Sequence, residues 1–237
     1  MLELDGLRIA LGDFRLDADL TVEAGARVAV MGPSGGGKST LLGAISGFVE
    51  PRAGAIRWQG ARVDTLPPAK RPLSILFQDH NLLPHLSAFD NVALGLDPNL
   101  RLSPDQRARV EAALARVGLE GLGARLPAQL SGGQISRTAL ARVLLRARPL
   151  ILLDEPFAAL GPALKADMLD LVAEIARDQR ATLLMVTHDP ADARRICPEI
   201  VIVADGSATP PAPTEALLSS PPPALAAYLG QPGAPGL

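Results

Sequence analysis

The chain has 237 residues, which is enough for one well-buried domain with a subdomain and too few for two full domains. Hydrophobic residues make up 48% of the sequence and charged residues 20%, so a disordered protein is excluded. The formal net charge of −2 argues against a surface that binds nucleic acid, and the one cysteine cannot form an internal disulfide.

No stretch approaches 18 consecutive apolar residues, and no charged-then-apolar leader precedes the first predicted strand. We therefore expect a chain that does not itself cross a membrane and that works in a reducing compartment. A membrane role would have to come through a partner.

Apolar and polar side chains alternate near the N-terminus. Over Phe14–Val22 every second residue is apolar, which predicts a strand with one solvated face. Leu2–Leu11 predicts an earlier strand or pair of strands, so we expect the chain to begin with an antiparallel sheet. Arg27–Met31 is mostly apolar and predicts a buried strand.

The buried strand leads into a phosphate-loop sequence, which is glycine, four free positions, then glycine, lysine and serine or threonine. Its residues are Gly32, Pro33, Ser34, Gly35, Gly36, Gly37, Lys38, Ser39 and Thr40. Glycines let backbone N–H groups point into one concave surface, and the helix that begins at Lys38 adds the positive end of its dipole. We expect Lys38 to contact the β- and γ-phosphates of a nucleoside triphosphate, and Ser39 to hold Mg²⁺.

A glycine-rich turn between a strand and a helix is the alternative interpretation of this loop. The buried strand before it and the apolar stripe of Leu41, Leu42 and Ile45 after it favour the nucleotide site. The loop alone leaves open what the nucleotide drives.

Further apolar runs predict the strands Gly54–Gly60, Leu73–Gln78, Leu150–Leu153, Thr182–Thr187 and Ile200–Val203. The run at Leu150–Leu153 has no polar residue, as expected of a parallel strand that is buried on both faces. Pro162 predicts the start of a helix before the next strand. The pattern indicates an α/β fold with a mostly parallel core sheet.

A helical segment interrupts these strands. Ser103 is a candidate N-cap, Pro104 suits the first helical position, and Gln106 stands three residues after the cap. The helix is expected to stop near Gly118. We interpret about residues 81–148 as an inserted α-helical subdomain.

The C-terminal residues 207–237 are rich in proline. We expect them to form a largely irregular tail outside a domain of residues 1–206, with one short helix near Ala224–Leu229. Because no motif residue lies in this tail, its deletion is expected to leave activity nearly intact.

Two acidic residues, Asp154 and Glu155, follow the apolar strand at its carboxyl end, where ligand crevices of open α/β sheets lie. We expect Asp154 to hold Mg²⁺ directly or through water, and Glu155 to polarise the attacking water as a general base. A strand that simply ends in polar residues is the alternative, which the phosphate loop upstream makes less favourable.

A second candidate phosphate site lies at Leu130–Gln134, just before a predicted helix. Its residues are Ser131, Gly132, Gly133 and Gln134. A serine hydroxyl, free backbone N–H groups and the positive helix end would bind phosphate, although a capped helix start without a ligand is the alternative. One nucleotide with two phosphate clamps predicts a head-to-tail dimer, in which each copy's second clamp closes on the other's nucleotide.

Together these motifs resemble the ATPase subunit of an ATP-binding-cassette (ABC) transporter over about residues 1–206. The resemblance is carried by the phosphate loop, Gln78, Leu130–Gln134, Asp154, Glu155 and His188. It implies that Gln78 touches Mg²⁺ and the attacking water and relays to the membrane subunits. It also implies that His188 contacts the γ-phosphate and that Glu155 is the catalytic base.

The same resemblance implies a phosphate-loop NTPase cassette fold that binds ATP and Mg²⁺. The implied partners are a second copy in a head-to-tail ATP sandwich, transmembrane permease subunits and, indirectly, a periplasmic solute-binding protein. The implied location is peripheral, on the cytoplasmic face of the inner membrane. No nucleic acid partner is expected.

Four segments are similar to the ATPases of thiamine importers of Gram-negative bacteria, namely Pro68–Gln78, Asn91–Leu96, Ala124–Gln129 and Thr182–Val186. From the short length we also expect no extra C-terminal β-domain of the kind usual in maltose or iron importers. This resemblance implies transport of thiamine or its phosphates. The alternatives are an importer of another small solute (iron, sulfate, polyamine or sugar), a cassette ATPase not coupled to transport, and a small-molecule kinase, which would have no use for a second clamp.

Three features depart from the family pattern. Gly161 stands where an aspartate is usual, and Ile135 and Ser136 stand where arginine or glutamine often follows the signature. No aromatic residue is obvious for stacking on adenine, because Leu11 lies nearest the usual position and Phe14 is the candidate substitute. These departures bear on the rate of hydrolysis and on nucleotide affinity.

Overall fold

Eleven strands form a single sheet in the computed structural model, which describes residues 1–79, 81–158 and 160–229. They are β1 Leu2–Leu11, β2 Phe14–Val22, β3 Arg27–Met31, β4 Ala53–Trp58, β5 Ala61–Arg62, β6 Leu73–Leu76, β7 Leu150–Asp154, β8 Thr182–Val186, β9 Glu199–Ala204, β10 Ser207–Ala208 and β11 Ala212–Pro213. Their spatial order is β5-β4-β1-β2-β10-β9-β3-β8-β7-β6, and β11 pairs with β9.

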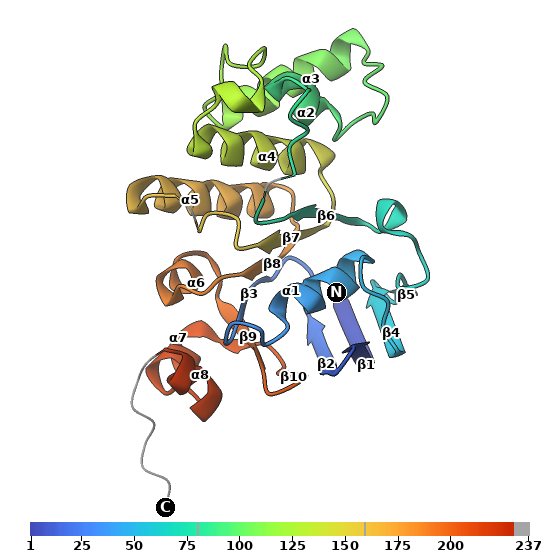
Figure 1. Ribbon diagram of the computed structural model, residues 1–237, viewed down its shortest axis with the longest axis vertical. Coiled ribbons are helices and arrows are strands. Elements are labelled where there is room, and N and C mark those ends of the chain that lie inside the picture. Colours follow the sequence, from blue (N-terminus) through green and yellow to red (C-terminus); the bar gives the residue numbers. More distant parts are fainter. Residues whose placement is uncertain (80, 159, 230–237) are drawn as a thin grey trace, which may run out of the picture.

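The helices of the described residues are α1 Lys38–Ser46, α2 Ala88–Ala93, α3 Pro104–Arg116, α4 Gly132–Arg146, α5 Pro162–Asp178, α6 Pro190–Ile196, α7 Thr214–Ser219 and α8 Pro223–Tyr228. Short 3₁₀ turns occur at Pro68–Lys70 and Pro127–Gln129. Figure 1 shows α2, α3 and α4 at one end of the molecule and α7 and α8 at the other. Among the described residues, no helix combines the length and the apolar character needed to cross a membrane.

The strands divide into a parallel and an antiparallel part. Neighbours along β6-β7-β8-β3-β9 are parallel, whereas β1 is antiparallel to both β2 and β4. This confirms the predicted α/β fold with a mostly parallel core and an N-terminal antiparallel part. The bounds of β2 and β3 are those that the sequence pattern predicted, while β6 ends at Leu76, two residues early.

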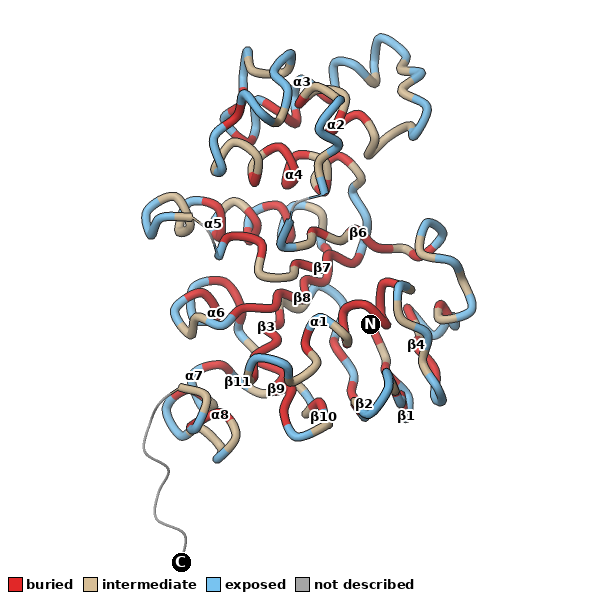
Figure 2. The backbone as a smooth tube through the Cα atoms, in the orientation of Figure 1, coloured by how far each residue is buried: buried red, intermediate tan, exposed pale blue. Residues whose placement is uncertain are grey.

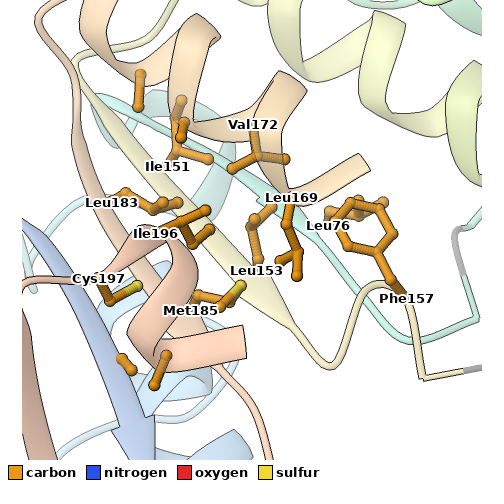
Figure 3. Close-up of a cluster of buried hydrophobic side chains, with 14 of the residues drawn as sticks. Leu76, Ile151, Leu153, Phe157, Leu169, Val172, Leu183, Met185, Ile196 and Cys197 are labelled. Atoms are coloured by element: carbon orange, nitrogen blue, oxygen red, sulfur yellow. The ribbon is translucent and has the colours of Figure 1, made fainter. Parts of the chain in front are cut away.

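The parallel strands are buried on both faces, as the apolar runs required (Figure 2). In β3, Val28 and Val30 belong to the cluster that joins α1 to the antiparallel strands. Ala29 and Met31, which point the other way, belong to the cluster under α5 and α6. Figure 3 shows this second cluster, in which side chains from β7 and β8 meet those of α5 and α6.

The helices α2, α3 and α4 share a hydrophobic cluster of their own, as expected for an inserted helical unit. The start of α3 is the predicted one, since Ser103 Oγ accepts from the Gln106 N–H at 3.2 Å and Gln106 Oε1 accepts from the Ser103 N–H at 2.9 Å. Gly118, just after the helix, has φ +70° and ends it. The division of the chain at residues 81–148 and after 206 stays a prediction.

The expectation of a largely irregular tail is wrong for residues 207–229, which contain β10, β11, α7 and α8. The short helix predicted near Ala224–Leu229 is confirmed as α8. Proline does not prevent helix formation here, because Pro223 occupies the first turn of α8, where no backbone N–H is needed. Leu218 and Leu225 are buried in the cluster under α5 and α6. The rest of the predicted tail, residues 230–237, lies outside the described residues.

Candidate functional site

The phosphate-loop sequence leaves β3 at Met31 and enters α1 at Lys38, as predicted. A Cβ atom at Gly32 would lie 2.0 Å from the main-chain oxygen of Val203, so no larger residue fits there. At Gly37, where φ is +102°, a Cβ would lie 2.5 Å from the Phe14 ring. The loop therefore needs glycine at both ends, and the Gly36 N–H closes a turn on the Pro33 oxygen at 3.1 Å.

Lys38 is buried and folds back over the loop. Its Nζ donates to the main-chain oxygens of Gly32 and Pro33, both at 2.8 Å. Burial lowers the pKa of Lys38, and the nearby carboxylates of Glu155 and Asp154 oppose that shift. The loop thus holds a positive charge among acceptors that a phosphate group could replace.

Ser39 and Asp154 come together from α1 and the end of β7. The Ser39 hydroxyl donates to Asp154 Oδ1 at 3.1 Å. Burial raises the pKa of Asp154, and the hydrogen bond from Ser39 opposes this shift. This pair fits Mg²⁺, because the cation takes oxygen ligands and is usually held by one or two carboxylates together with substrate phosphates. Among the described residues, no group of three or more His, Cys, Asp and Glu side chains could hold a metal ion. Mg²⁺ at Ser39 and Asp154 would therefore need substrate phosphates as further ligands.

Glu155 and His188 follow neighbouring strands, β7 and β8, and their side chains meet. Glu155 Oε2 lies 3.2 Å from His188 Nδ1. Glu155 has φ +44°, an uncommon backbone conformation for a residue with a side chain. Its N–H donates to the Val186 oxygen at 3.2 Å, which ties this strained position to β8. The pair therefore sits at the carboxyl edge of the parallel sheet, beside the phosphate loop.

A cavity of about 450 Å³ lies over these groups. Its lining includes loop residues between Ser34 and Thr40 together with Phe14, Glu155, His188 and Tyr228. A cavity with loop N–H groups, a lysine, a carboxylate and an imidazole can bind a phosphate chain and transfer protons beside it. Phe14, the candidate aromatic of the sequence pattern, does border the cavity.

Tyr228 was missed by the sequence analysis. It lies at the end of α8, the short helix that the sequence predicted but to which it gave no functional residue, and its hydroxyl donates to the main-chain oxygen of His188 at 3.0 Å. No local pattern connects residues that stand 40 positions apart, so only the fold reveals this contact.

The second phosphate clamp lies at the start of α4. Ser131 caps the helix, its Oγ accepting from the Gln134 N–H at 3.3 Å while Gln134 Oε1 accepts from the Ser131 N–H at 2.9 Å. The N–H groups of Gly132 and Gly133 occupy the first turn, which has no intrahelical acceptors. A Cβ at Gly133 would lie 2.4 Å from the Leu164 side chain, so α5 packs closely there. Ser131 and Gly132 are exposed, and neither is among the described residues that line the cavity.

Two other predicted positions lie apart from the cavity. Gln78 is exposed in the turn after β6 and is not among the described lining residues. Gly161 caps α5 with φ −65° and no atom within 4 Å of a Cβ built there, so this glycine does not serve a left-handed turn. The structure therefore brings together the phosphate loop, Asp154, Glu155 and His188, and leaves the second clamp and Gln78 outside.

Residues 16–158 match the family described as ABC transporter. The thiamine import ATP-binding protein ThiQ of Cereibacter sphaeroides is 62% identical over 97% of this chain and 100% of its own length. The protein of the same name from Ruegeria sp. is 57% identical over 97% of this chain and 100% of its own length. A dimeric ATP-binding cassette solved in a post-hydrolysis state, bound to ADP and Pi, matches with a TM-score of 0.80 at 30% identity over 90% of this chain and 99% of that one.

Proposed function

The chain belongs to the ABC transporter family, and from that premise we propose that it is the ATP-hydrolysing subunit of a bacterial thiamine importer. The similarity to thiamine import ATP-binding proteins along almost the whole chain carries the proposal. The cavity over the phosphate loop supports it, because its charges and N–H groups suit the triphosphate of ATP.

Lys38 acts by exchanging acceptors. When ATP binds, its Nζ leaves the oxygens of Gly32 and Pro33 and contacts the β- and γ-phosphates. The N–H groups of the loop and the positive end of α1 bind the remaining phosphate oxygens. The Lys38 ammonium group is buried, so it stabilises negative charge more strongly than an exposed lysine would.

Ser39 and Asp154 would hold Mg²⁺, and Gln78 would approach it from the turn after β6. The metal, when bound, neutralises charge that develops on the β- and γ-phosphates. Glu155 accepts a proton from the attacking water, whose oxygen bonds to the γ-phosphorus as the bond to the bridging oxygen breaks. His188 contacts the γ-phosphate and lies against Glu155.

Two copies close head to tail over two nucleotides. Ser131, Gly132, Gly133 and Gln134 of one copy then contact the γ-phosphate bound by the other. The exposure of Ser131 and Gly132 supports this, as does the dimeric state of the related cassette. The clamp uses N–H groups that the capping box leaves unpaired, so capping of α4 and phosphate binding are compatible.

A groove between β6 and α4 is the proposed contact with permease subunits on the cytoplasmic face of the inner membrane. Ser74, Phe77 and Arg146 line a cavity of about 260 Å³ there. The Phe77 ring lies edge-on to that of Phe48, with centroids 5.5 Å apart, and Phe48 is 61% exposed. Gln78 follows Phe77 directly, so movement of a partner in this groove would reach it. A periplasmic solute-binding protein would act through the permease.

Uptake of labelled thiamine tests the proposal. A strain that lacks this gene is complemented with the wild type or with Lys38→Ala, and uptake of iron, sulfate, a polyamine and maltose is measured in parallel. We expect the wild type alone to restore thiamine uptake. Normal thiamine uptake in the deletion strain, together with loss of the uptake of another solute, would contradict the assigned substrate.

A further inference from the structure

The segment after the last core strand returns to the nucleotide site. Leu218 of α7 and Leu225 of α8 are buried in the cluster under α5 and α6. Thr214 Oγ1 donates to the main-chain oxygen of Cys197 at 2.6 Å, just after α6. These contacts place α8 so that Tyr228 borders the cavity together with Glu155 and His188.

His188 is held through its neighbours on both sides. Thr187 Oγ1 donates to Asp192 Oδ2 at 2.8 Å, and Lys165 Nζ donates to Asp189 Oδ2 at 2.8 Å. The oxygen of His188 itself accepts from the Tyr228 hydroxyl at 3.0 Å. The imidazole is 54% exposed, so its contact with Glu155 depends on a fixed backbone rather than on surrounding packing.

We propose that Tyr228 is a positioning residue for ATP hydrolysis, which fixes the His188 backbone by its hydroxyl and thereby holds the imidazole against Glu155. This inference rests on the proposed function. The hydroxyl donates to the main-chain oxygen of His188, whose position is set by the ψ torsion of that residue. Loss of the hydroxyl therefore frees the backbone that orients the imidazole. The proposed effect of Tyr228 on His188 does not act through the phosphate loop.

The Tyr228 phenol suits this role because it is a donor at neutral pH. Burial raises its pKa first of all, and the carboxylates of Glu155 and Asp189 raise it further. The neutral hydroxyl is therefore the form that faces His188. The aromatic ring also borders the cavity, so the test must separate the hydroxyl from the ring.

Tyr228→Phe removes the hydroxyl and keeps the ring. We expect kcat for ATP hydrolysis to fall about three- to ten-fold, the effect of one hydrogen bond, while KM for ATP stays within about two-fold. Ser207→Ala is the matched control, because it removes another side-chain to main-chain bond, from the Ser207 hydroxyl to the Ala204 oxygen at 3.2 Å, which has no part in placing α8. Its kcat is expected to equal that of the wild type.

A double-mutant cycle with His188→Ala distinguishes positioning from a general structural role. Residual rates are measured in single turnovers with labelled ATP. If Tyr228 acts through His188, Tyr228→Phe has no further effect in the His188→Ala background. An equal fall in both backgrounds, a wild-type kcat, or a raised KM with unchanged kcat would each overturn the inference. Absence of ATPase activity in the wild type itself would instead contradict the proposed function.

Discussion

The Nζ atom of Lys38 donates to the main-chain oxygen of Gly32, six residues earlier, so the cation of the phosphate loop is bonded to the loop itself. The second bond, to Pro33, has the same length of 2.8 Å. A buried ammonium group needs such acceptors when no phosphate is present. The two main-chain oxygens therefore lower the free-energy cost of burying the Lys38 ammonium group until the phosphates of a nucleotide replace them as acceptors.

Lys38→Ala should abolish ATP hydrolysis, with a loss of about 100-fold or more, because the charge that stabilises the transferring phosphate is gone. Steady-state phosphate release measures this. Lys70→Ala is the control, since Lys70 is an exposed lysine in the turn before β6. Turnover of Lys38→Ala at the wild-type rate would contradict the site assignment.

Gly161→Asp should stabilise the fold by a few tenths of a kcal/mol, because Gly161 is the N-cap of α5 and aspartate caps helices better than glycine. Its φ of −65° suits any residue. If the new charge also lies at the dimer contact, the ATPase rate or its cooperativity changes while the affinity of the monomer for nucleotide does not.

Gly161→Asn separates the two effects, because it caps the helix without adding charge. Thermal melting and hydrolysis against ATP concentration are measured for both variants. Equal kinetics for wild type, Gly161→Asp and Gly161→Asn would assign Gly161 to the helix start alone.

Leu225→Ala should cost about 2–5 kcal/mol, because Leu225 is fully buried under α5 and α6. Leu126→Ala is the control and should cost much less, since that leucine is 41% exposed. Denaturant unfolding measures both.

Deletion of the residues after Gly206 should destabilise the protein, because it removes the buried side chains of Leu218 and Leu225. This replaces the expectation from the sequence that the deletion leaves activity nearly intact.

Cys197, the one cysteine of the chain, reports on the same packing. Burial raises its pKa to about 12, so the native thiol should resist thiol reagents. Leu225→Ala should make labelling faster, and Leu126→Ala should not. Fast labelling of the native wild type would contradict the buried position that Figure 3 shows.

Tyr228, the single tyrosine, should ionise above its ordinary pKa of 10.0. Because the folded-state value is the higher one, the stabilising contribution is complete below the unfolded pKa and is lost as pH rises through the folded one. The ultraviolet absorbance of tyrosinate follows this titration, with Tyr228→Phe as the blank and circular dichroism to confirm the fold. A midpoint below 10.0 in the folded protein would contradict the surroundings described for the phenol.

Local patterns predicted the elements whose causes are local. The alternation in Phe14–Val22 gave the bounds of β2, and the Ser103 capping box gave the start of α3. The short helix α6 was missed, although Asp189 accepts from the Ala191 N–H at 2.9 Å and Pro190 occupies its first position. That capping signal was present in the sequence and could have been used.

Contacts between distant parts of the chain could not be predicted in this way. The phosphate loop, Asp154 and Glu155 were recognisable because each follows a buried strand. The return of α8 to His188 depends on how Leu218 and Leu225 pack, which no local pattern encodes. The proline content of the segment suggested irregular structure, yet Pro213 belongs to β11, Pro221 and Pro222 lie between α7 and α8, and Pro223 begins α8.

The nucleotide-dependent dimer tests the central claim, that one copy's Ser131 clamp completes the site of the other. Glu155→Gln should bind ATP, hydrolyse it about 10²–10⁴-fold more slowly and accumulate as a closed pair. Size-exclusion chromatography with light scattering should give a dimer with ATP and a monomer with ADP, and adding Ser131→Arg should restore the monomer. A Glu155→Gln protein that stays monomeric with ATP at high protein concentration would contradict the account.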